Sequence, residues 1–144
     1  INSPDTTAVS SSTYINGLHV EQKISIELPA SILENMTEGL EILPAVADDE
    51  FYEITRGYVR LNGVAAMSGH NIEIETSVDG HSLMKVPASF FNTDFNSMFL
   101  SKTTPPTTNL HFSEGVTLIS NTDMSFAGGA TTLSIQLVYR IIKL

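Results

Sequence analysis

Histidine and carboxylate side chains are the residues of this sequence that could bind a metal ion, because the chain has four histidines and no cysteine. The histidines are His19, His70, His81 and His111. No two of them have the i, i+4 spacing of a helix or the i, i+2 spacing of a strand that brings two ligands to one ion. Asp79-Gly80 predicts a hairpin turn. His70 and His81 flank this hairpin and could meet near Glu73 or Glu75, but exposed hairpin histidines are the simpler interpretation. We therefore expect no metal site.

The other candidate sites are also incomplete. Asp48-Asp49-Glu50 is a charged run that could contact calcium, but three successive residues cannot all point at one ion, and no D-x-D-x-D-G loop is present. Gly128-Gly129 lacks the lysine and helix of a phosphate-binding loop. No G-x-S-x-G motif presents a serine nucleophile. The sequence thus predicts no catalytic residue, no cofactor and no enzyme activity.

The charge of the chain is negative and unevenly distributed. The 144 residues include 7 Lys and Arg against 16 Asp and Glu, and up to Glu53 the only base is Lys23. We expect no nucleic-acid binding, because phosphate contacts need Lys and Arg. We also expect no membrane span, because the chain lacks an apolar run of about 18 residues. An acidic side suits contact with a basic neighbouring protein, and the alternative is that the charge only provides solubility.

Alternating and β-branched runs, separated by turn residues, predict strands along most of the chain. The predicted strands are 20–28, 40–43, 51–61, 72–78, 82–86, 115–120 and 131–142. Ser31 and Glu34 have capping-box spacing, which predicts one helical turn. We expect a single all-β domain over 14–144, a sandwich or a barrel. The small polar residues 1–13 predict a flexible N-terminal arm.

Two segments are unusually rich in large apolar side chains. Strand 51–61 has them at both odd and even positions. This pattern is typical of a strand covered on both faces, by a second sheet or by another subunit. Segment 90–99 gathers phenylalanine and methionine beside Asn and Ser, and it can be a strand or a loop. Core packing is one interpretation of these aromatics, and a subunit interface is the other. The candidate interface residues are Phe51, Tyr52, Tyr58, Phe90, Phe91, Phe95 and Phe99.

Several short motifs follow one another in an order known from other proteins. They are the turn SILENMT, the segment GLEILPAVADDEFYEITRGYVRLNG and the C-terminal segment SEGVTLISNTDMSFAGGATTLSIQLVYRIIKL. In this order the chain resembles small virion structural proteins of tailed bacteriophages. The resemblance is carried by Leu43-Pro44-Ala45, 51–61, 116–119, Gly128-Gly129 and 132–141. The turn AVADDE departs from the family pattern, in which a glycine is usual.

The resemblance implies a jelly-roll-like antiparallel β-sandwich on the phage particle, as a head decoration, head-fibre or tail component without catalytic residues. Its partners would be the major capsid protein or other virion proteins, and it would form a homo-oligomer, with a trimer favoured. Synthesis in the bacterial host cytoplasm and residence in the virion would follow. The alternative is a receptor- or glycan-binding module of a tail or fibre.

Overall fold

The computed structural model describes residues 20–102 and 110–144, which form eight β-strands and three short helical segments. The strands are β1 (Gln22–Pro29), β2 (Leu40–Leu43), β3 (Glu50–Asn62), β4 (Ile72–Thr76), β5 (Ser82–Val86), β6 (Ser97–Leu100), β7 (Val116–Ile119) and β8 (Thr132–Lys143). The described chain is therefore all-β, as predicted. The predicted arm 1–13 and most of the loop 101–109 lie outside the described residues.

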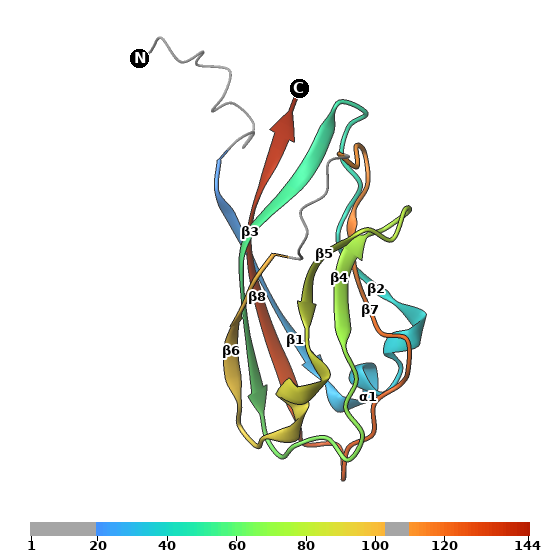
Figure 1. Ribbon diagram of the computed structural model, residues 1–144, viewed down its shortest axis with the longest axis vertical. Helices are drawn as coiled ribbons and strands as arrows, with labels where there is room; N and C mark the ends of the chain where they lie inside the picture. The colour runs from blue at the N-terminus through green and yellow to red at the C-terminus, as the bar shows by residue number, and fades with distance from the viewer. Residues whose placement is uncertain (1–19, 103–109) are drawn as a thin grey trace.

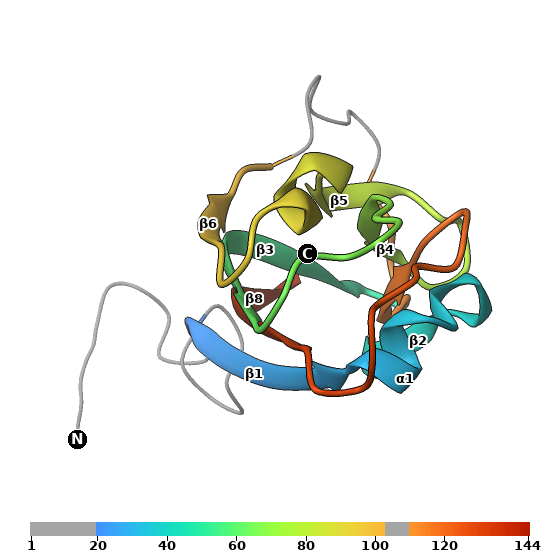
Figure 2. The ribbon, with the colours of Figure 1, turned by 90° about the horizontal axis from the view of Figure 1, so that it is seen from below.

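Two four-stranded antiparallel sheets make up the fold, with the strand orders β1-β8-β3-β6 and β2-β7-β4-β5 (Figure 1). The view from below shows the two sheets on opposite sides of a common interior (Figure 2). The longest pairing joins β3 to β8, from Glu50 opposite Lys143 to Asn62 opposite Thr132. Only β4 and β5 are both adjacent in sequence and paired, so most of the sheet structure is long-range.

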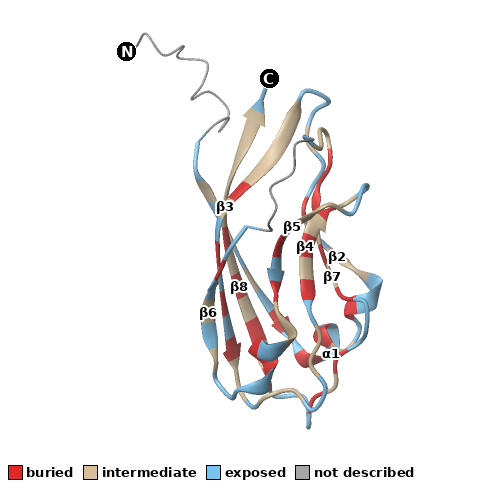
Figure 3. Ribbon diagram, viewed as in Figure 1, coloured by how far each residue is buried: buried red, intermediate tan, exposed pale blue. Residues whose placement is uncertain are grey.

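The hydrophobic core lies between the sheets and draws alternate residues from each (Figure 3). Leu133, Ile135 and Leu137 of β8 are buried, and so are Ile72 and Ile74 of β4. This period of two is the alternation that the sequence shows, because successive side chains of a strand point to opposite faces. Burial of one such aliphatic side chain stabilises the fold by about 1.5–3 kcal/mol.

A β-bulge explains why strand β3 is apolar on both sequence parities. Ile54 lies opposite Tyr139 and Arg56 lies opposite Val138, so Thr55 is an extra residue on β3. An extra residue turns the following side chains to the other face of the sheet. Ile54 is therefore buried on the same side as Val59, although their parities differ. Within the described part of this chain only one face of β3 is covered, by the second sheet. The other face is open, because Arg56, Tyr58 and Arg60 are exposed.

The helical segments are short and lie in the lower half of the structure in Figure 1. They are α1 (Ala30–Leu33) and two 3-10 helices, η2 (Met36–Glu38) and η3 (Ala88–Asn92). The predicted helical turn is present, but the predicted capping box is not formed. Pro29 is the N-cap, and the Glu34 carboxylate accepts a hydrogen bond from the distant Phe126 N–H at 3.2 Å. In the described ranges, no helix has the length and apolar character needed to span a bilayer.

Candidate functional site

The seven aromatic residues predicted for an interface have three different environments. Phe90 and Phe91 are buried in the core, where their rings contact edge to face with centroids 5.3 Å apart. Both belong to η3, which turns their side chains inward. The structure thus corrects the prediction for these two residues, because neither offers surface to a partner. Core packing, the other interpretation of this segment, applies to them.

Phe51 and Tyr52 are half-buried at the start of β3. The Phe51 ring contacts the edge of Phe112 at a centroid distance of 5.5 Å, and the Tyr52 ring contacts Tyr139 at 5.7 Å. The Tyr52 hydroxyl donates a hydrogen bond to the Pro44 carbonyl at 2.7 Å. Both residues line a pocket of about 220 Å³ between the sheets. Phe51 and Tyr52 therefore pack mainly against other residues of this chain and present little of their side chains at its outer surface.

Because of the environment of Tyr52, we expect the folded protein to lose stability at alkaline pH. Burial, assisted by Tyr139, Glu41 and Glu50, raises its pKa from 10.0 to about 12. A pKa that is higher in the folded state gives stability that is fully present below pH 10.0 and is lost as pH rises through about 12. Tyr52→Phe removes both the ionisation and one hydrogen bond, which costs about 1 kcal/mol at neutral pH.

The urea unfolding free energy of the wild type and of Tyr52→Phe measures this effect. We expect the deficit of the variant to shrink as the pH approaches the raised pKa, because only the wild type loses stability through this phenol. The phenylalanine ring preserves the packing against Tyr139. The comparison therefore isolates the effect of the hydroxyl group. A deficit that stays constant across the alkaline range would contradict the assignment.

Tyr58 and Phe99 form an aromatic pair on the surface. Tyr58 lies on β3 opposite Phe99 on β6, and the ring centroids are 5.4 Å apart. The Phe99 side chain is 80% exposed, and Tyr58 is exposed as well. Phe95 is also exposed, but it lies in the turn before β6 with a positive φ of 50°. Of the seven predicted interface residues, Tyr58 and Phe99 are the two that occupy an exposed sheet face together.

The face around this pair is the outer face, by which we mean the side of the β1-β8-β3-β6 sheet that points away from the core. It carries Lys23, Arg56 and Arg60, which are three of the chain's seven Lys and Arg residues. Arg56 contacts the Glu21 carboxylate at 3.0 Å. Tyr58 lines two adjoining hollows of this face, one with Phe99 and the other with Arg60. The exposed aromatic pair therefore has both basic neighbours and an acidic one, because Glu27 lines the same hollow as Arg60.

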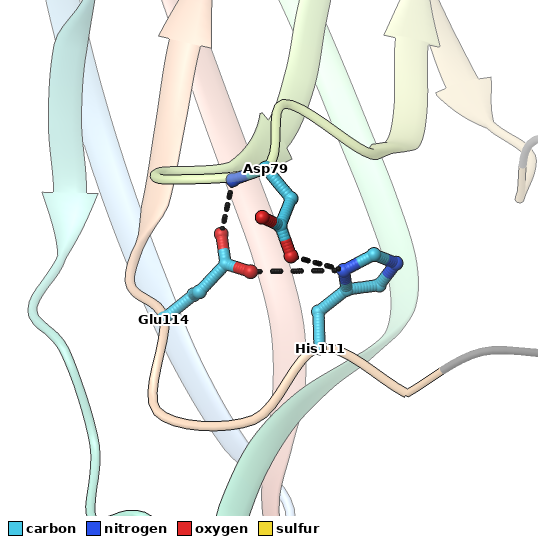
Figure 4. Close-up of side chains that lie close together, drawn as sticks. All are labelled: Asp79, His111 and Glu114. Carbon is cyan, nitrogen blue, oxygen red and sulfur yellow. Dashed lines mark hydrogen bonds and ion pairs between the residues drawn. The ribbon is translucent and has the colours of Figure 1, made fainter.

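A second site joins one residue of the β4–β5 turn to two residues of the segment before β7. Asp79 and Glu114 both point toward the imidazole of His111 (Figure 4). Asp79 Oδ2 lies 3.0 Å from His111 Nδ1, and Glu114 Oε2 lies 3.6 Å from the same nitrogen. Asp79 belongs to the turn of the predicted Asp79-Gly80 hairpin, which the structure forms between β4 and β5. His111 and Glu114 belong to the segment that precedes β7.

The Asp79–His111–Glu114 cluster is fixed from several sides. Glu114 is only 6% exposed, and its Oε1 accepts the backbone N–H groups of Val78 and Asp79 at 2.7 and 2.8 Å. The hydrogen bond with His111 lowers the pKa of the Asp79 carboxyl, which favours its ionised form. The His81 ring stacks on the His111 ring at a centroid distance of 4.6 Å. The cluster is therefore preorganised rather than a chance meeting of flexible side chains.

Gly115 holds the backbone of this segment against β2. A Cβ atom at this position would lie 2.4 Å from the Leu43 carbonyl oxygen, which is too close for any side chain. The close approach fixes where Glu114 enters the space below the β4–β5 turn. His81, His111 and Glu114 also line the pocket that contains Phe51 and Tyr52.

His70 and His81, which could have met across the hairpin, have other contacts. His70 Nε2 lies 3.1 Å from the Ser68 hydroxyl, whereas His81 contacts His111. The charged run 48–50 acts as a turn, in which Glu50 accepts the Ala47 N–H at 3.0 Å. The only local signal for the cluster is the spacing of His111 and Glu114, three residues apart, and it gives no hint of Asp79.

Comparison of the chain with known proteins gives no assignment. No protein-family model matches the sequence, and no curated protein matches it.

Proposed function

We propose that the chain is a non-enzymatic structural protein of a tailed-bacteriophage particle, and that its copies associate through the outer face. The observation that carries the proposal is the exposed Tyr58–Phe99 pair on a sheet face. Aromatic and arginine side chains are enriched in protein interfaces, where they supply most of the binding energy. The resemblance of the sequence to virion structural proteins of tailed bacteriophages supports a place in the phage particle.

The finer architecture that we propose is a jelly-roll β-sandwich. The strand orders β1-β8-β3-β6 and β2-β7-β4-β5 support it, because two interleaved Greek keys of eight strands produce this arrangement. Burial of alternate residues from both sheets in one core supports a sandwich as well. Jelly rolls are common in viral capsid proteins, which agrees with a virion role, and in lectin domains.

Charge favours the outer face as the contact between identical copies. A chain with a net charge of −9 repels its own copies on average. On the outer face, Lys23, Arg56 and Arg60 offset nearby acids. Arg56 pairs with Glu21, and Glu27 lines the same hollow as Arg60, so this repulsion is smaller here than over the chain as a whole. We therefore propose a homo-oligomer that buries the outer face, and a trimer is the state that the resemblance favours.

The other sheet would then face different virion proteins, with the major capsid protein as the first candidate. Glu73 and Glu75 alternate with buried residues along β4, so both point outward. Burial and the nearby Glu73 raise the pKa of Glu75, as expected where acids crowd one another. An acidic face of this kind suits a basic neighbour. Residence in the virion after synthesis in the host cytoplasm belongs to the same proposal.

One observation favours a second function, a receptor- or glycan-binding module. The pocket of about 220 Å³ combines the aromatic residues Phe51 and Tyr52 with polar groups such as Glu53 and Lys102. Aromatic rings beside carboxylates are the kind of surface that binds sugars, and a few polar groups in a largely apolar pocket are typical of ligand sites. On this alternative the chain would still be a part of a phage tail or fibre.

Quantitative mass spectrometry of purified particles tests the virion role. We expect the chain to copurify with particles of the phage that encodes it, in a fixed ratio to the major shell protein. A ratio near that of the shell protein identifies a head decoration, and a few copies per particle identify a tail component. Abundant host proteins measured in the same sample give the background. Absence of the chain from the particles overturns the proposal, together with the tail or fibre module, and leaves a binding protein that acts apart from the particle.

A further inference from the structure

Three side chains with metal-binding atoms converge at the Asp79–His111–Glu114 cluster, although they come from separate parts of the chain. Their nearest ligand atoms all lie within 4.8 Å of one another, and Figure 4 shows both carboxylates directed at one imidazole. We propose that this cluster binds a divalent first-row transition-metal ion, with Zn²⁺ as the probe. The ligands are Nδ1 of His111 and one carboxylate oxygen each from Asp79 and Glu114. This site is independent of the outer face and of the virion role.

The distances from His111 Nδ1 to the two carboxylates suit such an ion. Nitrogen and oxygen ligands lie about 2.0–2.2 Å from Zn²⁺, so two ligands in a tetrahedral arrangement are about 3.4 Å apart. The separations of 3.0 and 3.6 Å between His111 Nδ1 and the two carboxylates lie on either side of this value. An ion could therefore replace the contacts among the three side chains with small side-chain adjustments.

The site is supported by surrounding groups that hold the ligands in position. Oε1 of Glu114 is held by the Val78 and Asp79 N–H groups, which leaves Oε2 directed at His111. Hydrogen bonds of this type orient metal-binding carboxylates and tune their affinity. A carboxylate that is 6% exposed also needs a nearby positive charge, and a divalent ion provides more of it than an imidazole.

The ligand types select the class of metal. Imidazole nitrogen suits Zn²⁺, Cu²⁺, Fe²⁺ and Ni²⁺, whereas Mg²⁺ and Ca²⁺ prefer sites made only of oxygen atoms. Three protein ligands leave a fourth position for water or for another ligand. Because Asp79 comes from the β4–β5 turn and the other ligands precede β7, a bound ion would also join two segments that are far apart in sequence.

Calorimetric titration of the tag-free, chelator-treated full chain with Zn²⁺ tests the proposal. We expect one ion per chain, and a melting temperature raised by roughly 5 °C or more at a hundredfold excess over Kd. Mg²⁺ at the same concentration should give neither effect. Co²⁺ bound in place of Zn²⁺ should show the visible absorption of an ion with nitrogen and oxygen ligands, a signal that a purely structural hydrogen-bond network cannot give.

Asp79→Asn is the decisive variant, because this side chain is exposed and its loss does not endanger folding. Changes in outer-shell partners typically cost 10–100-fold in metal affinity, so loss of a direct ligand should weaken Zn²⁺ binding at least about 10-fold. His111→Gln should do the same. Asp48→Asn and His70→Gln, outside the cluster, are matched controls and should bind as the wild type. Failure of the wild type to bind Zn²⁺, or equal binding by Asp79→Asn, overturns the proposal.

Discussion

Phe91→Ala is expected to lower the free energy of unfolding by about 3–5 kcal/mol, the usual loss for a buried phenylalanine. The Phe91 side chain is completely buried, and its ring contacts Phe90 edge to face. The packing around it is tight, since a Cβ at Gly69 would lie 2.7 Å from the Phe91 Cβ. Truncation therefore removes transfer free energy and leaves a cavity that its neighbours cannot fill.

Urea denaturation of the wild type and the variant measures the loss. Phe95→Ala is the matched control, because it removes the same ring four residues away from a position that is 66% exposed. Surface changes of this kind usually stay within about 0.5 kcal/mol. A loss below about 1 kcal/mol for Phe91→Ala would show that this side chain is not in the core and would restore it as an interface candidate.

Phe99→Glu is expected to break the association of the chain while leaving its fold intact. The proposed oligomer buries Phe99 beside Tyr58, and a central aromatic residue typically contributes at least 2 kcal/mol to an interface. That energy corresponds to association weaker by roughly 30-fold. A buried carboxylate without a partner adds a further penalty. The variant should therefore be monomeric at concentrations where the wild type forms the proposed oligomer.

Sedimentation velocity over a range of concentrations measures the oligomeric state. Phe95→Glu is the control, because it places the same charge at an exposed phenylalanine outside the outer face. We expect it to remain oligomeric. The far-UV circular dichroism spectra of both variants should match that of the wild type, because neither change affects the fold. A wild type that stays monomeric throughout, or oligomers unaffected by Phe99→Glu, would rule out the outer face as the contact between copies.

Both substitutions concern one segment whose sequence does not distinguish its phenylalanines. Phe90 and Phe91 are buried, whereas Phe95 and Phe99 are exposed, and all four are the same residue within ten positions. The local sequence pattern cannot tell the buried phenylalanines from the exposed ones, because η3 and the turn before β6 lack the two-residue alternation of a strand. Their burial depends on which face meets the opposite sheet.

The sequence by itself determined most of the strands and their turns, because alternation and turn residues are local properties. It left open whether the segment that forms β6 is a strand or a loop. The hairpin at Asp79-Gly80 and the long strand β8 both lie where the pattern predicts them. The absence of cysteine likewise excluded thiolate chemistry from composition alone. The bulge after Ile54 was not predictable, because an extra residue in one strand is defined only against its partner.

Only the tertiary structure decided which side chains could act together. Asp79 is 32 residues from His111, and Arg56 is 35 residues from Glu21, yet each pair is in contact. Pairing of strands distant in sequence creates these neighbours, and no spacing within one segment encodes them. The Tyr58–Phe99 pair arises in the same way, from the register of β3 against β6. Local periodicity thus gives the elements, and long-range pairing gives the sites.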